Sequence, residues 1–308
     1  MNPIFIEEFH KGSVGFEVFL TSHCNLKCRG CMRYSNIAKP EYYPFEKLKQ
    51  DFLNFKRINH DYMYFCLTGG EPLLHPNFLE IAEWLAEQFP TCAVVTCTNA
   101  MLFTKQTDGW YKRLSKCVDI LHYTRYNTNR VDYDKVIEIC EKYGIKHNNV
   151  LNTDTNHVFF MLKDYLTKEE LIDIQSKVKK SQQENTPTRY VFYNDKLSEP
   201  HEKSPSLNTK KYLRCKGDCL CIWDGKIWMC SKCSNAHILN ERYNTNFIVS
   251  EDDYLDLYKL QSREEIFDFW CRPIPFCRYC FNYPSTRIEW ETRNAKKSDF
   301  IGGIDDEL

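Results

Sequence analysis

The sequence predicts an α/β fold in which a parallel sheet with crossover helices fills the first two thirds of the chain. Short apolar runs alternate with segments of helical apolar spacing from Val14 to about residue 195, as is typical of β-strands joined by covering helices. Residues 181–211 are then polar and carry prolines, which indicates a linker. A chain of 308 residues can bury a core of this size and a second, smaller one. We therefore expect a first domain over residues 1–195 and a second over residues 196–308.

The elements of the first domain follow from the spacing of apolar residues. Strands are predicted where apolar residues run continuously over a few positions, and helices where they recur every three or four positions. Gly144 and Pro90 each mark the end of a helix. The predicted strands are Val14–Leu20, Met63–Leu67, Ala93–Cys97, Asp119–Tyr123, Lys146–Val150 and Tyr190–Tyr193, the last of which is expected to complete the sheet. The predicted helices are Phe45–Phe55, Phe78–Ala86, Trp110–Leu114, Tyr133–Tyr143 and Lys168–Lys179.

Composition and charge argue against several classes of protein. The net charge of −1 gives no support to electrostatic binding of nucleic acid. The chain has no run of about 18 apolar residues, and its N-terminal residues lack a basic segment followed by an apolar one. We therefore expect a soluble, cytoplasmic protein that does not act at a membrane. In such a protein, sixteen cysteines indicate metal binding rather than a disulfide framework.

Three cysteines with the spacing C-x3-C-x2-C follow the first predicted strand: Cys24, Cys28 and Cys31. Three thiolates in one short loop can hold three irons of a [4Fe–4S] cube and leave the fourth iron open to an outside ligand. A zinc knuckle or free thiols are the alternatives, although His23 adjoins Cys24 too closely to share its metal comfortably.

Two further motifs follow the next two predicted strands. The motif Gly69-Gly70-Glu71-Pro72 combines glycines, which let the backbone approach a ligand closely, with a carboxylate that can accept hydrogen bonds from an ammonium group. Thr98 and Asn99 follow the third strand. An ordinary turn after a strand is the alternative for both motifs. Because ligand sites on parallel sheets gather at the carboxyl ends of the strands, we expect both motifs to lie near the cysteine loop.

Taken in this order, the cysteine loop and the two motifs resemble the radical S-adenosylmethionine (radical SAM) superfamily. The resemblance implies a partial (β/α)6 barrel, similar to a TIM barrel, and a [4Fe–4S] cluster whose open iron chelates the amino and carboxylate groups of SAM. It assigns Gly69, Gly70, Glu71 and Pro72 to the SAM amino group, and Thr98 and Asn99 to the SAM ribose.

The resemblance also implies the chemistry. An electron, supplied by a donor of the flavodoxin or ferredoxin type, splits the sulfonium, and the resulting 5′-deoxyadenosyl radical abstracts hydrogen from a substrate. The chain departs from the family pattern at Gly30, where an aromatic residue is usual, and at Ala100, where glycine is usual.

Arg125 follows the fourth predicted strand, so its side chain is expected to face the same site. Three roles are open to it: bidentate binding of the SAM carboxylate, binding of substrate, and orientation of a proton acceptor. A surface arginine on this loop is the plain alternative. Arg125 is therefore both the candidate catalytic residue and a candidate SAM ligand.

The second predicted domain is rich in cysteine. Cys221–Cys230 predicts a β-hairpin with an Asp-Gly turn, and Cys277-Arg278-Tyr279-Cys280 is a C-x2-C pair. This region resembles the auxiliary-cluster region of the SPASM and Twitch subgroup, and one auxiliary [4Fe–4S] cluster of the Twitch type fits best. The resemblance assigns Cys215, Cys230, Cys277 and Cys280 as its ligands, with Cys219, Cys221 and Cys271 as alternatives. A structural zinc held by four thiolates is the other interpretation. Other cysteines are expected to be small core residues: Cys66, Cys92, Cys97, Cys117 and Cys140.

A resemblance to aminocyclitol dehydrogenases implies the reaction. In those enzymes a substrate radical next to a hydroxyl group loses the O–H proton, gives one electron to the auxiliary cluster and becomes a ketone. We therefore expect two-electron oxidation of a hydroxylated small molecule. The alternatives are modification of a peptide or protein, as in sulfatase-maturating relatives, redox-neutral epimerisation, and a cluster protein that only carries electrons.

The ends of the chain bear on the substrate. The first predicted strand begins near Val14, which leaves no room for a leader-binding domain before it and favours a small molecule over a peptide. The GTP-acting enzyme of molybdenum-cofactor synthesis keeps a terminal Gly-Gly tail. Here Gly302 and Gly303 are followed by five residues, so that activity is not expected.

Overall fold

A computed structural model describes residues 15–58, 64–126, 128–149, 190–194, 197–198, 219–270, 272–280 and 286–302. Its internal contacts divide the chain into two compact units. The first unit comprises residues 1–15, 61–68 and 72–189, and the second comprises residues 16–60, 69–71 and 190–308. The expected domain boundary at residue 195 stays a prediction.

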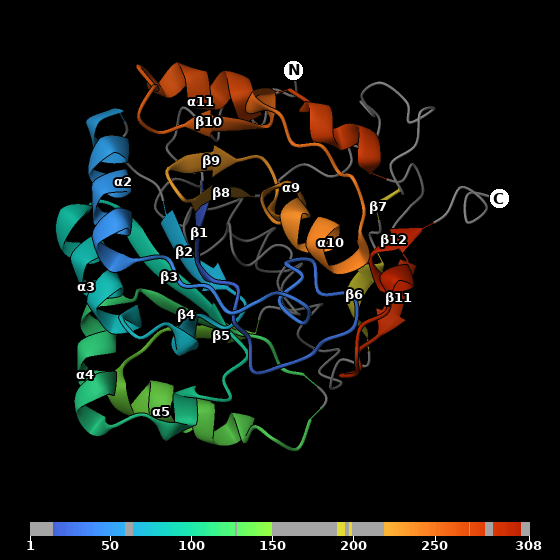
Figure 1. Cartoon of the computed structure of the whole chain (residues 1–308). Helices are drawn as coiled ribbons and strands as arrows, with labels where there is room; N and C mark the ends of the chain where they lie inside the picture. The colour runs from blue at the N-terminus through green and yellow to red at the C-terminus, as the bar shows by residue number, and fades with distance from the viewer. Residues whose placement is uncertain are drawn as a thin grey trace, which may run out of the picture. The chain divides into compact units, whose positions relative to one another are not determined.

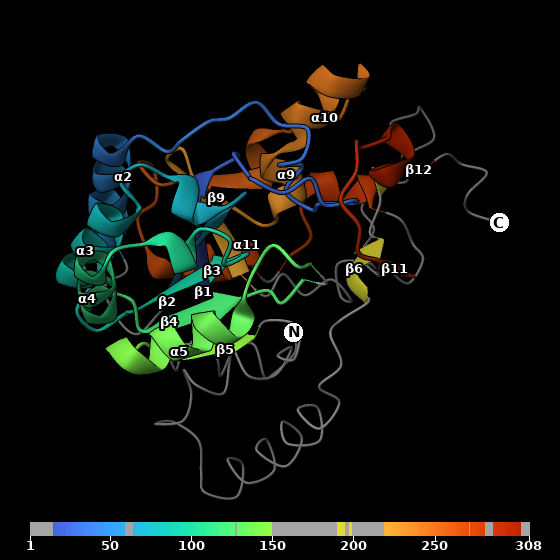
Figure 2. The ribbon, with the colours of Figure 1, turned by 90° about the horizontal axis from the view of Figure 1, so that it is seen from below.

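The first unit carries a parallel sheet with helices between its strands. Four strands lie in the order β2-β3-β4-β5, and each neighbouring pair is parallel. Figures 1 and 2 show α3 and α4 side by side along these strands. The strands are β2 (Tyr64–Gly69), β3 (Ala93–Thr98), β4 (Ile120–Tyr123) and β5 (His147–Asn149). The helices are η1 (Pro72–Leu74), α3 (Phe78–Gln88), η2 (Phe103–Lys105), α4 (Asp108–Cys117) and α5 (Tyr133–Tyr143).

Local sequence signals explain where these helices begin and end. Thr107 caps α4 by accepting a hydrogen bond from the N–H of Trp110, and Asp132 caps α5 by accepting one from the N–H of Lys135. Gly144 ends α5 in the left-handed conformation, with φ of 66°. The predicted alternation of strands and helices is therefore confirmed over residues 64–149, and with it the α/β class.

The second unit combines the strand that precedes the cysteine loop with a mostly antiparallel sheet. Its strands lie in the order β10-β9-β8-β1, and Figure 1 shows β9 between β8 and β10. The predicted hairpin is confirmed: β8 pairs antiparallel with β9, and Asp224 and Gly225 form the turn with φ of 49° and 70°. These strands are β1 (Gly15–Thr21), β8 (Cys219–Trp223), β9 (Lys226–Trp228) and β10 (Tyr254–Asp256).

Helices and two small sheets complete the second unit. The helices are α2 (Phe45–Ile58), α9 (Ser231–Ser234), α10 (Ala236–Tyr243), η4 (Glu251–Asp253), α11 (Arg263–Trp270), η5 (Pro275–Tyr279) and η6 (Lys297–Asp299). The small sheets pair β6 (Tyr190–Asn194) with β11 (Thr286–Glu289), and β7 (Leu197–Ser198) with β12 (Ile301–Gly302). None of the helices in the described ranges has the length and hydropathy that crossing a membrane requires.

One predicted strand has a different partner from the one expected. Tyr190–Tyr193 is a strand, but the prediction that it completes the parallel sheet is wrong, because β6 pairs antiparallel with β11. A period-two pattern identifies a strand without identifying its neighbour, so the pairing depends on which distant segment is packed beside it. The helix predicted over Lys168–Lys179 lies outside the described residues.

Candidate functional site

The three-cysteine loop begins where β1 ends, and hydrogen bonds to the following segment hold its start. Thr21 and Ser22 donate from their hydroxyl groups to the carbonyl oxygens of Glu41 and Lys39, at 2.5 and 2.6 Å. Further along, the side-chain amide of Asn36 donates to the carbonyl oxygen of Cys28 at 2.7 Å. Gly30 takes a positive φ of 64°, which a residue without a Cβ adopts readily. The loop is therefore folded back on itself.

The thiols of this loop are close enough to influence one another. Burial raises the pKa of Cys24, and the charges of Glu71, Cys31 and Cys28 act in the same direction. Burial also raises the pKa of Cys28, to about 12, although a hydrogen bond from Trp290 opposes the rise. Thiols that resist ionisation this strongly become thiolates when a cation replaces their protons.

The Gly69–Glu71 motif lies directly against this loop. The backbone N–H groups of Gly70 and Glu71 donate to the carbonyl oxygens of Thr21 and His23, at 2.6 and 2.8 Å. A Cβ on Gly69 would lie 2.3 Å from the Thr21 oxygen, and a Cβ on Gly70 would lie 2.3 Å from the His23 oxygen. Only glycine permits this approach, so the expected meeting of the first and second motifs is confirmed for these residues.

Whether this loop fits an iron–sulfur cluster depends on its donors and their surroundings. Three thiols in one short loop are the donor set that such a cluster needs. The buried carboxyl group of Glu71, 1% exposed, lies beside them, close enough to raise the pKa of Cys24. Among the described residues, no three His, Cys, Asp or Glu side chains stand in a metal-ligating arrangement. The residues fit the group in their chemistry.

Thr98, the last residue of β3, and Asn99 begin a buried turn. The Thr98 hydroxyl oxygen accepts from the N–H of Ala100, and the Asn99 side-chain oxygen accepts from the N–H of Met101, both at 3.0 Å. Ala100 has a φ of 61°, the left-handed conformation in which the family pattern has glycine. The role of Thr98 and Asn99 toward the SAM ribose stays a prediction, as does that of Pro72, which begins η1.

Arg125 lies in the loop after β4, as expected from its position. Its guanidinium carbon is 5.5 Å from the centroid of the Tyr133 ring, and the residue lines a pocket of about 300 Å³ together with Asp132 and Asp134. A guanidinium is a group that can bind a carboxylate through two nitrogens. Its catalytic and SAM-binding roles stay predictions.

A second group of thiols gathers in the second unit. Burial raises the pKa of Cys233 well above its ordinary value, and the charges of Cys230, Asp253, Cys277 and Cys280 act in the same direction. The Sγ of Cys230 accepts a hydrogen bond from the N–H of Cys233 at 3.4 Å. The N–H of Cys280 donates to the carbonyl oxygen of Cys277 at 3.1 Å.

Cys233 is a member that sequence reasoning missed. The signal was present, because Cys230 and Cys233 repeat the C-x2-C spacing of Cys277 and Cys280. Two such pairs are a common way to present four thiolates to one metal site.

The other expected ligands of this site are only partly described. Cys215 and Cys271 lie outside the described residues, and Cys219 is placed in β8 by its backbone alone. Cys221 is buried in β8, and burial raises its pKa to about 12. The positive charge of Arg33 opposes this rise, and the negative charge of Glu17 adds to it. Among the cysteines expected in the core, Cys66, Cys92, Cys117 and Cys140 are buried, as predicted, and Cys97 is partly exposed.

Comparison with known proteins places this arrangement in a family. The model of the family described as "Radical SAM superfamily" matches residues 18–174, just over half of the chain. GTP 3′,8-cyclase of Haemophilus influenzae (strain PittEE) is 29% identical over 115 residues, which are 35% of this chain and 32% of that protein. GTP 3′,8-cyclase 1 of Mycobacterium tuberculosis (strain H37Rv) is 31% identical over 132 residues, 37% of this chain and 35% of that protein. The chain thus spans about a third of the length of the curated relatives it matches.

Solved structures match at lower identity. BtrN in complex with AdoMet and 2-DOIA is 17% identical with a TM-score of 0.36, over 46% of this chain and 58% of that one. Hexahistidine-tagged anSMEcpe with bound AdoMet is 16% identical with a TM-score of 0.46, over 83% of this chain and 80% of that one. On the match of the family model to residues 18–174, the chain belongs to the radical SAM superfamily.

Proposed function

We propose that Cys24, Cys28 and Cys31 hold the [4Fe–4S] cluster that membership of this family implies, and that Gly69, Gly70 and Glu71 bind the amino group of SAM. The support is that the glycine motif is hydrogen-bonded to the backbone of the residues that lead into the cysteine loop. The cluster with SAM supplies a 5′-deoxyadenosyl radical that removes hydrogen from substrate. Cys24, Cys28 and Cys31 provide its thiolates, and buried Glu71 provides a negative charge for the ammonium group.

We further propose a second cluster site on Cys230, Cys277 and Cys280. The fourth ligand is Cys215, as the family resemblance implies, or Cys233, which the gathering of charges around it favours. The single observation that carries the proposed reaction is this second group of thiols. An oxidation must pass one electron from the substrate radical to an acceptor, and a redox-neutral reaction needs no such acceptor.

The proposed reaction is dehydrogenation of a hydroxylated small molecule. One hydrogen atom leaves the carbinol carbon for the 5′-deoxyadenosyl radical and gives 5′-deoxyadenosine. The hydroxyl proton would pass to water, and the remaining electron would pass to a cluster held at the second site, so the substrate would become a ketone. Arg125, in its pocket with Asp132 and Asp134, is proposed to bind the SAM carboxylate or a substrate anion. A flavodoxin or ferredoxin type of protein is the proposed electron donor.

Metal analysis after anaerobic reconstitution tests both cluster sites. Wild-type protein is expected to bind about eight irons, and the triple variant Cys24→Ala, Cys28→Ala, Cys31→Ala about four. The double variant Cys277→Ala, Cys280→Ala is also expected to bind about four. Zinc in place of the second set of irons would make that site structural and would overturn the oxidase mechanism.

Two single variants identify the fourth ligand of the second site. If Cys233 is the ligand, Cys233→Ala loses the second cluster and Cys215→Ala keeps it, and the reverse pattern assigns Cys215. The cluster spectra of the Cys24, Cys28 and Cys31 site serve as the internal control, because neither substitution touches that loop.

Substrate trials separate the proposed reaction from a second candidate. The sequence similarity to GTP 3′,8-cyclases favours cyclisation of GTP as that candidate. Reduced enzyme is incubated with SAM and either a panel of aminocyclitols and sugars or GTP, and 5′-deoxyadenosine is measured. A product lighter by two hydrogens supports the dehydrogenase, an isomer of GTP supports the cyclase, and a stereoisomer of the substrate supports epimerisation.

A further inference from the structure

A segment near the end of the described chain lies along the three-cysteine loop. The N–H of Arg29 donates to the carbonyl oxygen of Glu291 at 2.9 Å, and the N–H of Arg293 donates to the carbonyl oxygen of Lys27 at 3.1 Å. An antiparallel bridge joins Cys28 to Thr292 between these two bonds. The stretch 290–299, which we call the clamp segment, therefore pairs with the middle of the loop as a short antiparallel ribbon.

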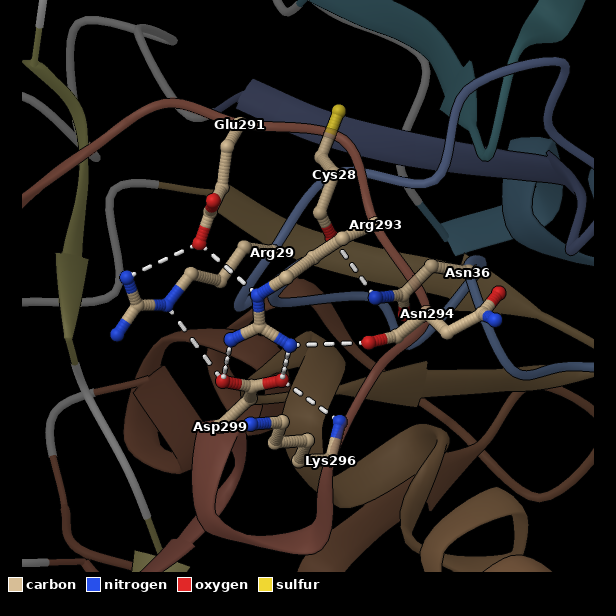
Figure 3. A network of polar contacts seen from close by, with 8 residues as sticks. All are labelled: Cys28, Arg29, Asn36, Glu291, Arg293, Asn294, Lys296 and Asp299. Carbon is tan, nitrogen blue, oxygen red and sulfur yellow. Dashed lines mark hydrogen bonds and ion pairs between the residues drawn. The ribbon is translucent and has the colours of Figure 1, made fainter.

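Charged side chains fasten this pairing. Figure 3 shows Arg29 and Arg293 converging on Glu291 and Asp299. Arg293 binds Asp299 through two nitrogens, at 2.9 and 2.5 Å, and also reaches Glu291 at 2.9 Å. Arg29 pairs with Glu291 at 3.1 Å and with Asp299 at 3.5 Å. The side chain of Asp299 is only 4% exposed, so its ion pairs with the two arginines are screened less by water than a surface ion pair, whereas Glu291 is 45% exposed.

The clamp segment brings one donor directly to a sulfur atom. The indole Nε1 of Trp290 donates to the Sγ of Cys28 at 3.3 Å. Packing alone would bring the ring to the loop, but it would not direct the N–H at the sulfur.

A hydrogen bond to a ligating sulfur changes the electronics of a cluster. Reduction adds negative charge to the irons and sulfurs, and a donor directed at a sulfur stabilises that charge. The reduced form is then favoured, and the reduction potential rises. The potential decides how readily an external donor can deliver the electron that SAM cleavage requires.

We infer that Trp290 is a positioning residue: through its N–H bond to Cys28 it raises the reduction potential of the first cluster. The Arg29–Arg293–Asp299 network holds Trp290 in this position. The inference rests on the proposed assignment of Cys24, Cys28 and Cys31 as cluster ligands.

A redox titration followed by electron paramagnetic resonance tests the inference. In Trp290→Phe an aromatic ring remains and the N–H is lost, so the midpoint potential of the SAM-perturbed signal is expected to become more negative than in wild type. Trp228→Phe is the matched control, because it removes an indole N–H that donates to the carbonyl oxygen of Trp223 at 3.3 Å. An unchanged potential in Trp290→Phe, at wild-type iron content, overturns the inference.

A second replacement keeps the test decisive if Trp290→Phe does not hold its cluster. Incorporation of benzothienylalanine at position 290 keeps the shape of indole and replaces its N–H by sulfur. A potential more negative than wild type supports the inference, and a wild-type potential overturns it. A wrong assignment of the three cluster ligands would be recognised separately. The SAM-perturbed signal would then survive in the Cys24→Ala, Cys28→Ala, Cys31→Ala variant.

Discussion

The backbone N–H of Gly70 donates a hydrogen bond of 2.6 Å to the carbonyl oxygen of Thr21, the last residue of β1. This bond ties the end of one predicted strand to the motif that follows the next. It explains why the chain has two glycines here, since a side chain at either position would collide with backbone.

Gly70→Ala is expected to destabilise the protein by about 1–3 kcal/mol and to weaken SAM binding. The new Cβ would lie 2.3 Å from the carbonyl oxygen of His23, and backbone atoms cannot move aside as a flexible side chain can. Urea denaturation and SAM titration measure the two effects. Gly109→Ala is the control: it lies in the first turn of α4, with its nearest neighbour atom at 3.9 Å, and should stabilise the protein by at most about 1 kcal/mol. Equal stability of the two variants would contradict the prediction.

Ala100→Gly is expected to stabilise the protein by up to about 1 kcal/mol. Ala100 has a φ of 61°, and this conformation costs a residue with a Cβ about 1–2 kcal/mol. Part of that gain is lost because glycine is more flexible in the unfolded chain. The thermal unfolding midpoint should rise, and a fall would show that the methyl group contributes more by packing than it costs in strain.

Asp51→Asn is expected to destabilise the protein by about 2 kcal/mol. The Asp51 side chain is fully buried and accepts hydrogen bonds from the hydroxyl groups of Tyr43 and Tyr258 and from the ammonium group of Lys47. An amide in its place turns N–H groups toward these donors. Denaturation in urea measures the loss, and a change below about 0.5 kcal/mol would show that the cluster rearranges. The exposed carboxylate of Glu46, paired with Lys49, offers a control in Glu46→Gln, for which almost no change is expected.

Arg113→Gln is expected to raise the pKa of Glu83 toward its ordinary value. A hydrogen bond from Arg113 holds the pKa of this carboxyl below its usual range, against the effect of burial. The folded pKa is thus lower than the unfolded one, so the pair stabilises the fold above the ordinary glutamate pKa of about 4.3. That stabilisation disappears as the pH falls through the folded pKa.

The Glu83 carboxyl can be followed directly by nuclear magnetic resonance across the pH range. Arg130→Gln, on the loop before α5, is the control and should leave the Glu83 titration unchanged. The same titration curve in wild type and Arg113→Gln would show that solvent screens the contact completely.

Local sequence signals were enough to predict the elements and the order of the motifs. Hydrophobic period, capping residues such as Asp132 and Gly144, and the Asp224-Gly225 turn act within a few residues, so strands, helices and the hairpin could be predicted from neighbours alone. The meeting of the Gly69–Glu71 motif with the cysteine loop could also be predicted, because parallel strands bring their carboxyl ends to one edge.

Which distant segments meet could not be predicted from local sequence signals. The pairing of β6 with β11, the gathering of Cys233 with Cys277 and Cys280, and the bond from Trp290 to Cys28 join positions far apart in the chain. Such contacts depend on how loops close and side chains pack, and apolar spacing carries no information about the partner. The physical reason is that a periodic pattern specifies which face of a segment is buried, while only packing specifies what buries it.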